Sequence, residues 1–237
     1  LLPLDGRKVL IVTDDGVPQE YARAVLAAAS EGEIFTLPAG EKTKSLASFE
    51  RLLRRMLDAG FTRSSAVCAV GGGVVGDLSG FVAACYMRGI DFYNIPTTML
   101  AMTDSSVGGK CAVDFHGTKN TVGAFYPPRA VVIDCDVLAT LSRRQTAAGL
   151  AEAVKMALTS DADFFAALEK EELPDATEIV SRSVAIKSRI VGEDEKEGGV
   201  RRLLNFGHTL GHAIEAASGL SGLLHGECVA LGMLPMC

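Results

Sequence analysis

The sequence has no concentrated positive charge and no long apolar run. Its formal net charge is -6 and it contains no basic cluster, which argues against a nucleic acid as the main partner. No stretch approaches the roughly 20 consecutive apolar residues of a membrane span. The opening residues contain a polar turn at Asp5 and Gly6, so we expect no signal peptide among them. We therefore expect neither a nucleic-acid partner nor a membrane partner.

Paired cysteines, internal repeats and low-complexity tracts are also absent. The six cysteines are isolated, and none forms the CxxC pattern of a zinc ribbon or a redox pair. Most of them lie in apolar runs, which predicts buried free thiols and a reducing, cytoplasmic location. The 237 residues are 48% hydrophobic and 22% charged, as expected for an ordinary globular protein with one large or two modest domains.

The first part of the chain alternates short apolar runs with helical segments. The runs at 7–13, 33–37, 65–70, 91–95 and 129–134 are typical of strands, and the segments at 18–30, 46–59 and 78–87 are typical of helices. This alternation predicts a parallel sheet with helical crossovers. Ligands of such folds bind at the carboxyl ends of the strands.

A glycine-rich stretch, GGGVVGD at 71–77, follows the third predicted strand directly and opens a helix. Glycines there let the backbone approach a phosphate closely, and a helix N-terminus favours an anion. The spacing is not GxGxxG, so a tight turn without a ligand is an equal alternative.

Two polar segments follow the fourth predicted strand. The sequence DSSVGGK at 104–110 is interpreted as a turn that ends in Lys110, and Lys119 and Asn120 lie in a second predicted loop. Lysine and asparagine on glycine-flanked loops are suited to a phosphorylated substrate. The alternative is a solvated hairpin tip.

After residue 141 the pattern becomes helical, with helices expected at 142–159, 162–171, 176–191, 201–217 and 225–235. We therefore predict an α/β domain over 1–140 and a helical domain over 141–237. Glu152 and Lys155 are three residues apart on the first of these helices. An exposed ion pair is the commonest meaning of that spacing, but the apolar neighbours predict that this pair faces inward.

Three of the four histidines lie between residues 205 and 227. His208 and His212 are four residues apart and share one face of a helix, and His225 follows in an HGE turn. Such residues, with a carboxylate added, suit a divalent metal; a surface pair or a satisfied core pair is the alternative. Lys187, Glu197, Arg201 and Asn205 cluster just before, as a substrate site or as surface charge.

Taken together, these motifs resemble one family. GGGVVGD, MRG, PTT, DSSVGGK, TKN, GLAEAVK, RRLLNFGHTLGHAIE and HGE occur in the order found in the 3-dehydroquinate synthase family of sugar-phosphate cyclases, from about Lys8 to Leu234. The resemblance implies a Rossmann-like NAD-binding α/β domain, then an all-helical metal-binding domain, with the active site in the cleft between them. Glycerol dehydrogenases share this two-domain plan.

The resemblance also implies roles for individual residues. Glu152, His208 and His225 match the metal ligands, for zinc or cobalt. His212 matches a substrate-contacting acid/base residue instead, Glu197 matches the other proton acceptor, and Lys155 matches a third catalytic position. The matches to substrate-binding positions are Arg88, Lys110, Asn120, Lys155, Lys187, Arg201, Asn205 and His212. The matches to NAD contacts are Asp14, Glu41, Lys44, Gly72, Gly73, Val74, Asp77, Thr97, Thr98, Asp104, Lys110, Lys119 and Thr140.

The implied reaction is cyclisation of 3-deoxy-D-arabino-heptulosonate 7-phosphate to 3-dehydroquinate and phosphate, in the shikimate route to aromatic amino acids. NAD would be used catalytically, and Lys110, Lys187 and Arg201 suit a substrate with a carboxylate and a phosphate. Arg88 resembles an arginine that reaches the substrate phosphate of the neighbouring subunit, so a homodimer is implied.

Three other functions stay open at this point. They are another cyclase such as 2-deoxy-scyllo-inosose synthase, a glycerol dehydrogenase-like alcohol dehydrogenase, and a non-catalytic NAD-binding scaffold. Two departures from the family pattern matter. Gly16 stands where many members have asparagine near the adenine ribose. Family members also begin before Leu1 and continue beyond Cys237 with further helices, one carrying a substrate lysine, so we expect the helical domain to be incomplete at its C-terminal end.

Overall fold

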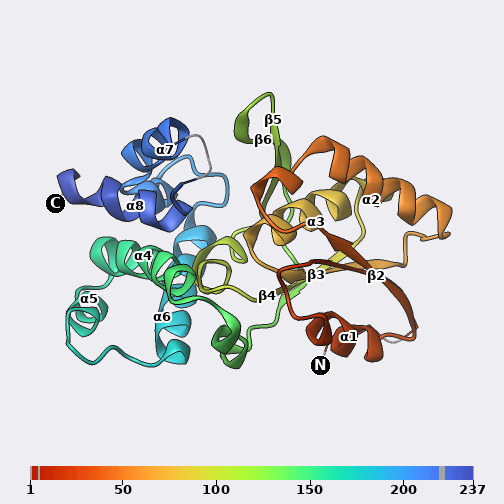
Figure 1. The fold of residues 1–237 in the computed structure, drawn as a ribbon, viewed down its shortest axis with the longest axis horizontal. Coiled ribbons are helices and arrows are strands. Elements are labelled where there is room, and N and C mark those ends of the chain that lie inside the picture. Colours follow the sequence, from red (N-terminus) through yellow and green to blue (C-terminus); the bar gives the residue numbers. More distant parts are fainter. Residues whose placement is uncertain (1, 5, 219–221, 237) are drawn as a thin grey trace. The chain divides into compact units, whose positions relative to one another are not determined.

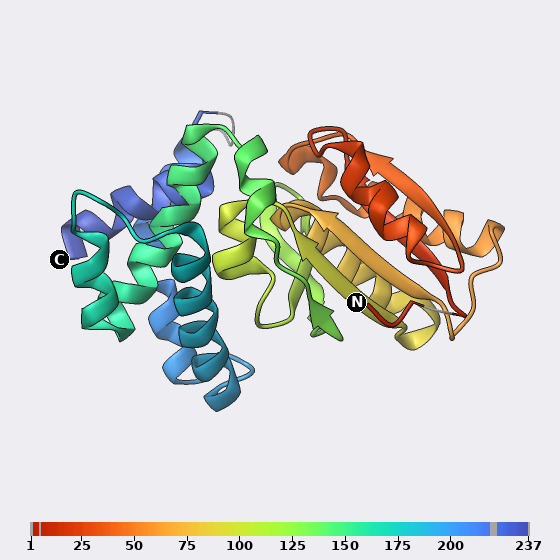
Figure 2. The same cartoon turned by 90° about the horizontal axis from the view of Figure 1, so that it is seen from below.

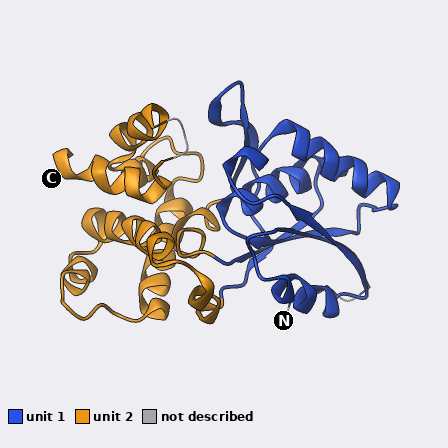
Figure 3. Ribbon diagram, viewed as in Figure 1, with its two compact units in different colours: residues 1–97, 109–133 blue, residues 98–108, 134–237 orange. Residues whose placement is uncertain are grey.

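The computed structural model describes residues 2–4, 6–218 and 222–236. They form two compact units (Figure 3): unit 1 comprises Leu1–Thr97 and Gly109–Ile133, and unit 2 comprises Thr98–Gly108 and Asp134–Cys237. The chain thus enters unit 2 twice, first through the short segment Thr98–Gly108. The domain boundary predicted after residue 140 divides the sequence linearly and stays a prediction.

Unit 1 is built on a parallel sheet, as the alternating pattern predicted. The strand order is β2-β1-β3-β4-β7, and every neighbouring pair is parallel (Figure 1). The strands are β1 (Lys8–Asp14), β2 (Glu31–Leu37), β3 (Ala66–Gly71), β4 (Asp91–Pro96) and β7 (Ala130–Val131). The last strand is shorter than predicted, because it pairs with β4 over only two residues at the edge of the sheet.

Both faces of this sheet are covered, so its central strands are apolar throughout. Val9 and Ile11 of β1 pack toward the helix α1 (Gln19–Ala27). Leu10 and Val12 point to the other face and pack against α2 (Leu46–Asp58) and α3 (Gly73–Cys85). Figure 2, seen from below, shows α1 on the near side of the sheet. The two faces explain why the strands show continuous apolar runs rather than alternation.

An antiparallel hairpin replaces the polar loops predicted around Lys110 and Lys119. Its strands are β5 (Lys110–Phe115) and β6 (Thr118–Phe125), joined by a turn in which Gly117 has a φ of 77°. The turn predicted to end in Lys110 is present at 106–109, whereas the separate loop at Lys119 and Asn120 is wrong, because both residues lie in β6 and the alternative of a hairpin is correct. Strand β5 buries Cys111 and Val113 in the core and exposes the lysine at its start. Lys110, Lys119 and Asn120 are therefore strand residues.

Unit 2 is helical, and none of the described helices is long and apolar enough to cross a bilayer. Its α-helices are α4 (Arg143–Ser160), α5 (Ala162–Leu168), α6 (Ala176–Glu193), α7 (His208–Ala217) and α8 (His225–Met233). The single helix predicted over 201–217 is wrong. A 3₁₀ segment, Val200–Asn205, ends before α7, and Gly207 between them has a φ of 76°. Arg201 and Asn205 therefore do not lie on turns of the helix that carries His208.

Candidate active site

Helix α4 carries Glu152 and Lys155 into the interior of unit 2. It begins with a reciprocal capping box between Ser142 and Gln145. A Cβ at Gly149 would lie 2.5 Å from the backbone nitrogen of Leu100, so the helix packs directly against the segment 98–108. Glu152 is 0% exposed and Lys155 is 1% exposed. The predicted inward-facing pair is thereby confirmed.

Two lysines and two carboxylates form a buried ionic cluster. The Lys155 ammonium donates to Glu152 Oε2 and lies 4.0 Å from Asp104 Oδ1. Lys187 Nζ, from α6, lies 2.8 Å from the same Asp104 oxygen and donates to the Asp104 carbonyl at 2.5 Å. Asp104 belongs to a π-helical turn, Ala101–Ser105. Buried charges require such partners, because an isolated one would cost several kcal/mol.

The cluster shifts the pKa values of its members in different directions. Burial acts to raise the pKa of Asp104, but the Lys187 and Lys155 ammonium groups outweigh it and hold that pKa well below its usual range. Burial acts to lower the pKa of Lys155, but Asp104 and Glu152 overcome it and raise that pKa. Burial lowers the pKa of Lys187. Of the two lysines, Lys187 is therefore the easier to deprotonate.

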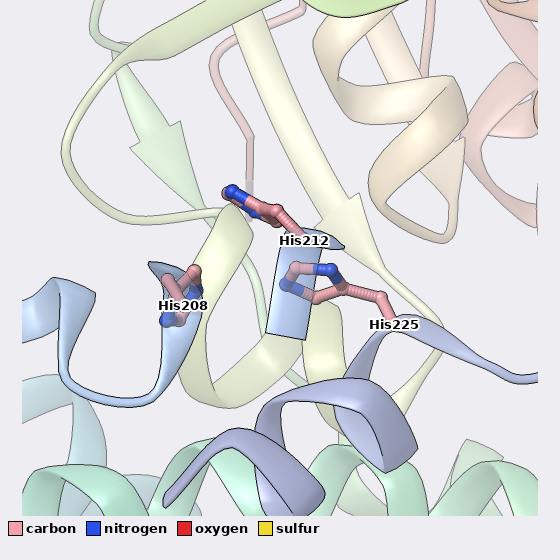
Figure 4. A group of neighbouring side chains, drawn as sticks. All are labelled: His208, His212 and His225. Atoms are coloured by element: carbon pink, nitrogen blue, oxygen red, sulfur yellow. The ribbon is translucent and has the colours of Figure 1, made fainter. Parts of the chain in front are cut away.

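Two histidines face the other oxygen of Glu152. His208 is the first residue of α7 and His225 is the first residue of α8. Their Nε2 atoms lie 3.8 Å and 3.6 Å, respectively, from Glu152 Oε1. Figure 4 shows these two rings gathered with that of His212. Among the residues that the structure describes, none donates a hydrogen bond to the buried Glu152 Oε1, and a buried oxygen of this kind is suited to binding a cation.

The protonation of the two histidines follows from their surroundings. Burial and the Lys155 charge lower the pKa of His208 to about 4, so its ring is neutral near pH 7. Burial also acts to lower the pKa of His225, but the hydrogen bond to Glu215 and the charge of Glu152 outweigh it and raise that pKa. A neutral imidazole nitrogen is the form that binds a metal ion.

These residues fit a divalent ion of the zinc or cobalt type in two ways. Glu152, His208 and His225 provide one carboxylate and two imidazoles around the unpaired Glu152 oxygen. The second possible ligand set is the three histidines His208, His212 and His225. Each offers one ring nitrogen, and these nitrogens lie within 4.8 Å of one another. The assignment of Glu152, His208 and His225 as ligands, with His212 beside them, stays a prediction.

Backbone and side-chain contacts hold the remaining predicted residues of unit 2. Arg201 is 1% exposed, and its guanidinium donates to the carbonyls of Gly108 at 2.9 Å and Glu195 at 2.5 Å. The Asn205 amide donates to Glu197 Oε1 at 2.7 Å. Glu197 has a φ of 63°, a conformation that L-residues rarely adopt. Their roles toward a substrate stay predictions.

Sequence reasoning assigned no role to the residues that fix α8 against α4. Arg144 donates from two nitrogens to the two oxygens of Glu227, each at 2.6 Å, and Glu227 accepts the backbone N–H of Leu224 at 2.7 Å. A Cβ at Gly226 would overlap the Ala148 carbonyl. These contacts hold the first turn of α8, and hence His225, beside α4. The motif HGE contained Glu227 without showing its partner.

In unit 1, residues predicted to contact NAD lie at the carboxyl ends of three strands. Gly72 caps α3 directly after β3, so Gly73 and Val74 open that helix. Asp14 ends β1, and the Thr97 N–H after β4 donates to the Gly71 carbonyl at 2.9 Å. The glycine stretch is therefore a strand-to-helix connection, the arrangement that can receive a phosphate at a helix N-terminus.

Lys44 organises a second polar group beside α3. Its ammonium lies 2.5 Å from both Asp77 Oδ2 and Asn120 Oδ1. Burial acts to lower the pKa of Lys44, but Asp77 and Glu41 outweigh it and raise that pKa. Glu41 in turn lies 3.3 Å from Lys119 Nζ. The structure thus brings together Lys44, Asp77, Glu41 and Lys119 from the predicted NAD set with Asn120 from the predicted substrate set.

The other predicted residues are dispersed. Arg88 and Lys110 are exposed on unit 1, and Thr98 and Thr140 belong to unit 2. Thr140 donates its hydroxyl to the Val137 carbonyl at 2.8 Å. Gly16 donates its backbone N–H to Asp14 Oδ1 at 2.9 Å, which closes the turn after β1. Nothing in these positions tests their predicted roles.

A parallel α/β unit followed by a helical unit is the fold shared with solved sugar-phosphate cyclases. Among solved structures, 2-epi-5-epi-valiolone synthase from Streptomyces hygroscopicus, determined with NAD+ and Zn2+ bound, is 34% identical with a TM-score of 0.87, over 96% of this chain and 67% of that one. A 2-deoxy-scyllo-inosose synthase, complexed with carbaglucose-6-phosphate, NAD+ and Co2+, is 32% identical with a TM-score of 0.84, over 95% and 65%.

The family models are more specific. The one described as 3-dehydroquinate synthase N-terminal matches residues 34–148, and the one described as 3-dehydroquinate synthase C-terminal matches residues 149–236. The chain belongs to the 3-dehydroquinate synthase family. The 3-dehydroquinate synthase of Caldanaerobacter subterraneus is 47% identical over 95% of this chain and 67% of its own length. The chain therefore spans about two thirds of the length of curated relatives that it matches.

Proposed function

We propose that the chain carries out the reaction for which its curated relatives are named, the cyclisation of 3-deoxy-D-arabino-heptulosonate 7-phosphate to 3-dehydroquinate with release of phosphate. The enzyme is a phosphate-eliminating lyase of the shikimate route that uses NAD and a divalent metal, zinc or cobalt. Two cyclases of similar structure were solved with NAD+ and with Zn2+ or Co2+, which supports both cofactors.

One observation carries the metal part of the proposal. Glu152 Oε1 is buried without a hydrogen-bond partner and faces the Nε2 atoms of His208 and His225. When bound there, a divalent ion would lower the pKa of the substrate hydroxyls that it holds. Lys155, which donates to the other Glu152 oxygen, orients the carboxylate.

The buried ionic cluster supports the substrate part. Lys155 and Lys187 carry charge in an interior from which water is largely excluded, as binding of an anionic keto-acid phosphate requires. His212 is exposed beside the two other histidines and would transfer protons, and Glu197 would act as the second proton acceptor. The described cysteines are free thiols, in keeping with the proposed cytoplasmic location.

The test of the proposed function is phosphate release from the heptulosonate phosphate by the purified chain. We expect release that requires NAD and is abolished by a chelator and restored by zinc or cobalt. A hexose 6-phosphate in place of the heptulosonate phosphate tests the inosose synthase alternative. Turnover of the hexose phosphate alone would assign the chain to that reaction, and no turnover of either would favour a non-catalytic scaffold.

NAD is expected to be recycled rather than consumed. The strand-to-helix glycine loop supports NAD binding, and NAD takes up and returns a hydride within one cyclase turnover. Absorbance at the NADH wavelength should therefore stay flat while phosphate accumulates. NADH formed in proportion to product would instead assign the chain to the alcohol dehydrogenases.

A homodimer is expected because of Arg88. This arginine is exposed, and the backbone holds Met87, Arg88 and Gly89 at φ values of 49°, 70° and 119°. Such a strained run of positive φ angles is maintained where a side chain must be aimed. Sedimentation should give twice the chain mass, and Arg88→Ala should lower phosphate release without monomerising the protein. A fully active monomer would contradict the proposal.

A further inference from the structure

Glu215 lies on the side of α7 that faces α8. Gly211 is four residues earlier and therefore on the same face of the helix. A Cβ at Gly211 would lie 3.0 Å from the Cys228 carbonyl oxygen of α8, so the two backbones nearly touch there. This close packing buries the Glu215 side chain to 5% exposure and fixes its distance from α8. A carboxylate buried in this way requires a polar partner.

One such partner is the ring of His225. Glu215 Oε2 lies 3.4 Å from His225 Nδ1, a long separation for an N–H···O bond, and the other ring nitrogen, Nε2, lies 3.6 Å from Glu152 Oε1. The imidazole is thus held between two buried carboxylates, with one at each nitrogen. That arrangement orients the ring.

His208 shows the same arrangement with a backbone acceptor. Its Nδ1 lies 3.2 Å from the Phe206 carbonyl, while its Nε2 faces Glu152 Oε1. In both rings an acceptor at Nδ1 favours the tautomer with a proton on that nitrogen, and this leaves the lone pair on Nε2. Both lone pairs are then directed toward the unpaired Glu152 oxygen. Glu215 therefore has the same role for His225 as the Phe206 carbonyl has for His208, which is to accept the proton on Nδ1.

We propose that Glu215 is a positioning residue, which accepts the Nδ1–H of His225 and so directs the Nε2 lone pair toward the metal shared with Glu152 and His208. The inference rests on the proposed function, since it takes His225 as a ligand. Partners of this kind typically change metal affinity by about 10- to 100-fold.

The test is the affinity of the purified chain for Co2+, measured by competition with a chromophoric chelator. Glu215→Ala is expected to weaken binding by about 10- to 100-fold. Glu215→Gln keeps an acceptor oxygen without its charge and is expected to weaken binding by roughly three- to tenfold. Ser218→Ala is the matched control, because the Ser218 hydroxyl donates to the backbone carbonyl of Glu215, at 2.8 Å, rather than to its carboxylate. It should leave affinity within about twofold of the unchanged chain.

A spectroscopic readout separates positioning from general damage to α7. In the metal-free chain, at a pH above the raised pKa of His225 so that the ring is neutral, ¹⁵N shifts of His225 should report the Nδ1–H tautomer, and Glu215→Ala should convert it to a mixture. Unchanged affinity in Glu215→Ala and Glu215→Gln, or an equal loss in Ser218→Ala, would overturn the inference. His225→Ala distinguishes the two failures. If it retains full Co2+ affinity, the metal assignment of the proposed function is wrong; if it alone loses affinity, only the role of Glu215 is wrong.

Discussion

Alanine at His208 or at His225 is expected to strip the metal and abolish turnover, whereas His212→Ala is expected to keep the metal and slow turnover by about 10²-fold or more. The reason lies in Glu152, whose buried, unpaired Oε1 faces the Nε2 atoms of His208 and His225. Two histidines and a carboxylate leave positions on a zinc ion open for substrate hydroxyls. A third histidine would take one of those positions.

Metal content of the three purified variants, with phosphate release, decides between the two ligand sets. The measurement is needed because His212 is close to both other histidines. Its ring centroid lies 5.3 Å from that of His208 and 5.7 Å from that of His225. Loss of metal from all three variants would show that the three-histidine set is the correct one, and loss from His212→Ala with retention in His225→Ala would show that His225 is not a ligand. His116, exposed on the hairpin turn of unit 1, supplies the control for removal of a histidine.

Gly226→Ala is expected to lower the free energy of unfolding by about 3 kcal/mol and to abolish metal binding. Gly226 follows His225 in the first turn of α8, and a Cβ there would overlap the backbone carbonyl of Ala148 in α4. Backbone atoms cannot rotate out of the way as a side chain can, so the two helices must move apart. That movement would withdraw His225 from Glu152, which lies one turn further along α4 than Ala148.

Chemical denaturation and metal content measure both effects. Gly222→Ala is the matched control, since it lies just before the same helix and a Cβ there would meet nothing within 4 Å. It should unfold and bind metal like the unchanged chain. Equal behaviour of Gly226→Ala and Gly222→Ala would mean that the approach of α8 to α4 is not what holds His225 in place.

The sheet could be predicted because burial on both faces makes its central strands continuously apolar, as Val9 to Val12 show. The hairpin could be named only as an alternative, since its polar residues resemble those of a loop until the burial of Cys111 and Val113 is known. The break before α7 was missed for a related reason. A glycine within a helical pattern is compatible with a continuous helix. The structure shows that Gly207 has a left-handed backbone conformation and packs against Met233, and neither feature can be read from the sequence.

The site was predictable where its signal is local. Apolar neighbours on α4 predicted that Glu152 and Lys155 face inward. Partners from different elements gave no such signal. Glu215 is ten residues from His225, on another helix, and Arg144 is 83 residues from Glu227. A motif identifies individual site residues. It does not identify their charged partners, because those depend on how the helices pack.

The double entry of the chain into unit 2 has a consequence for how the protein is made. Asp104 precedes Lys187 by 83 residues, and most of the intervening hairpin belongs to unit 1. During synthesis the carboxylate therefore leaves the ribosome well before the ammonium group that it neutralises. Contacts between residues so distant in the chain form late and slowly. The segment Thr98–Gly108 must wait for α4 and α6, so unit 2 cannot finish folding until the first unit has been synthesised in full.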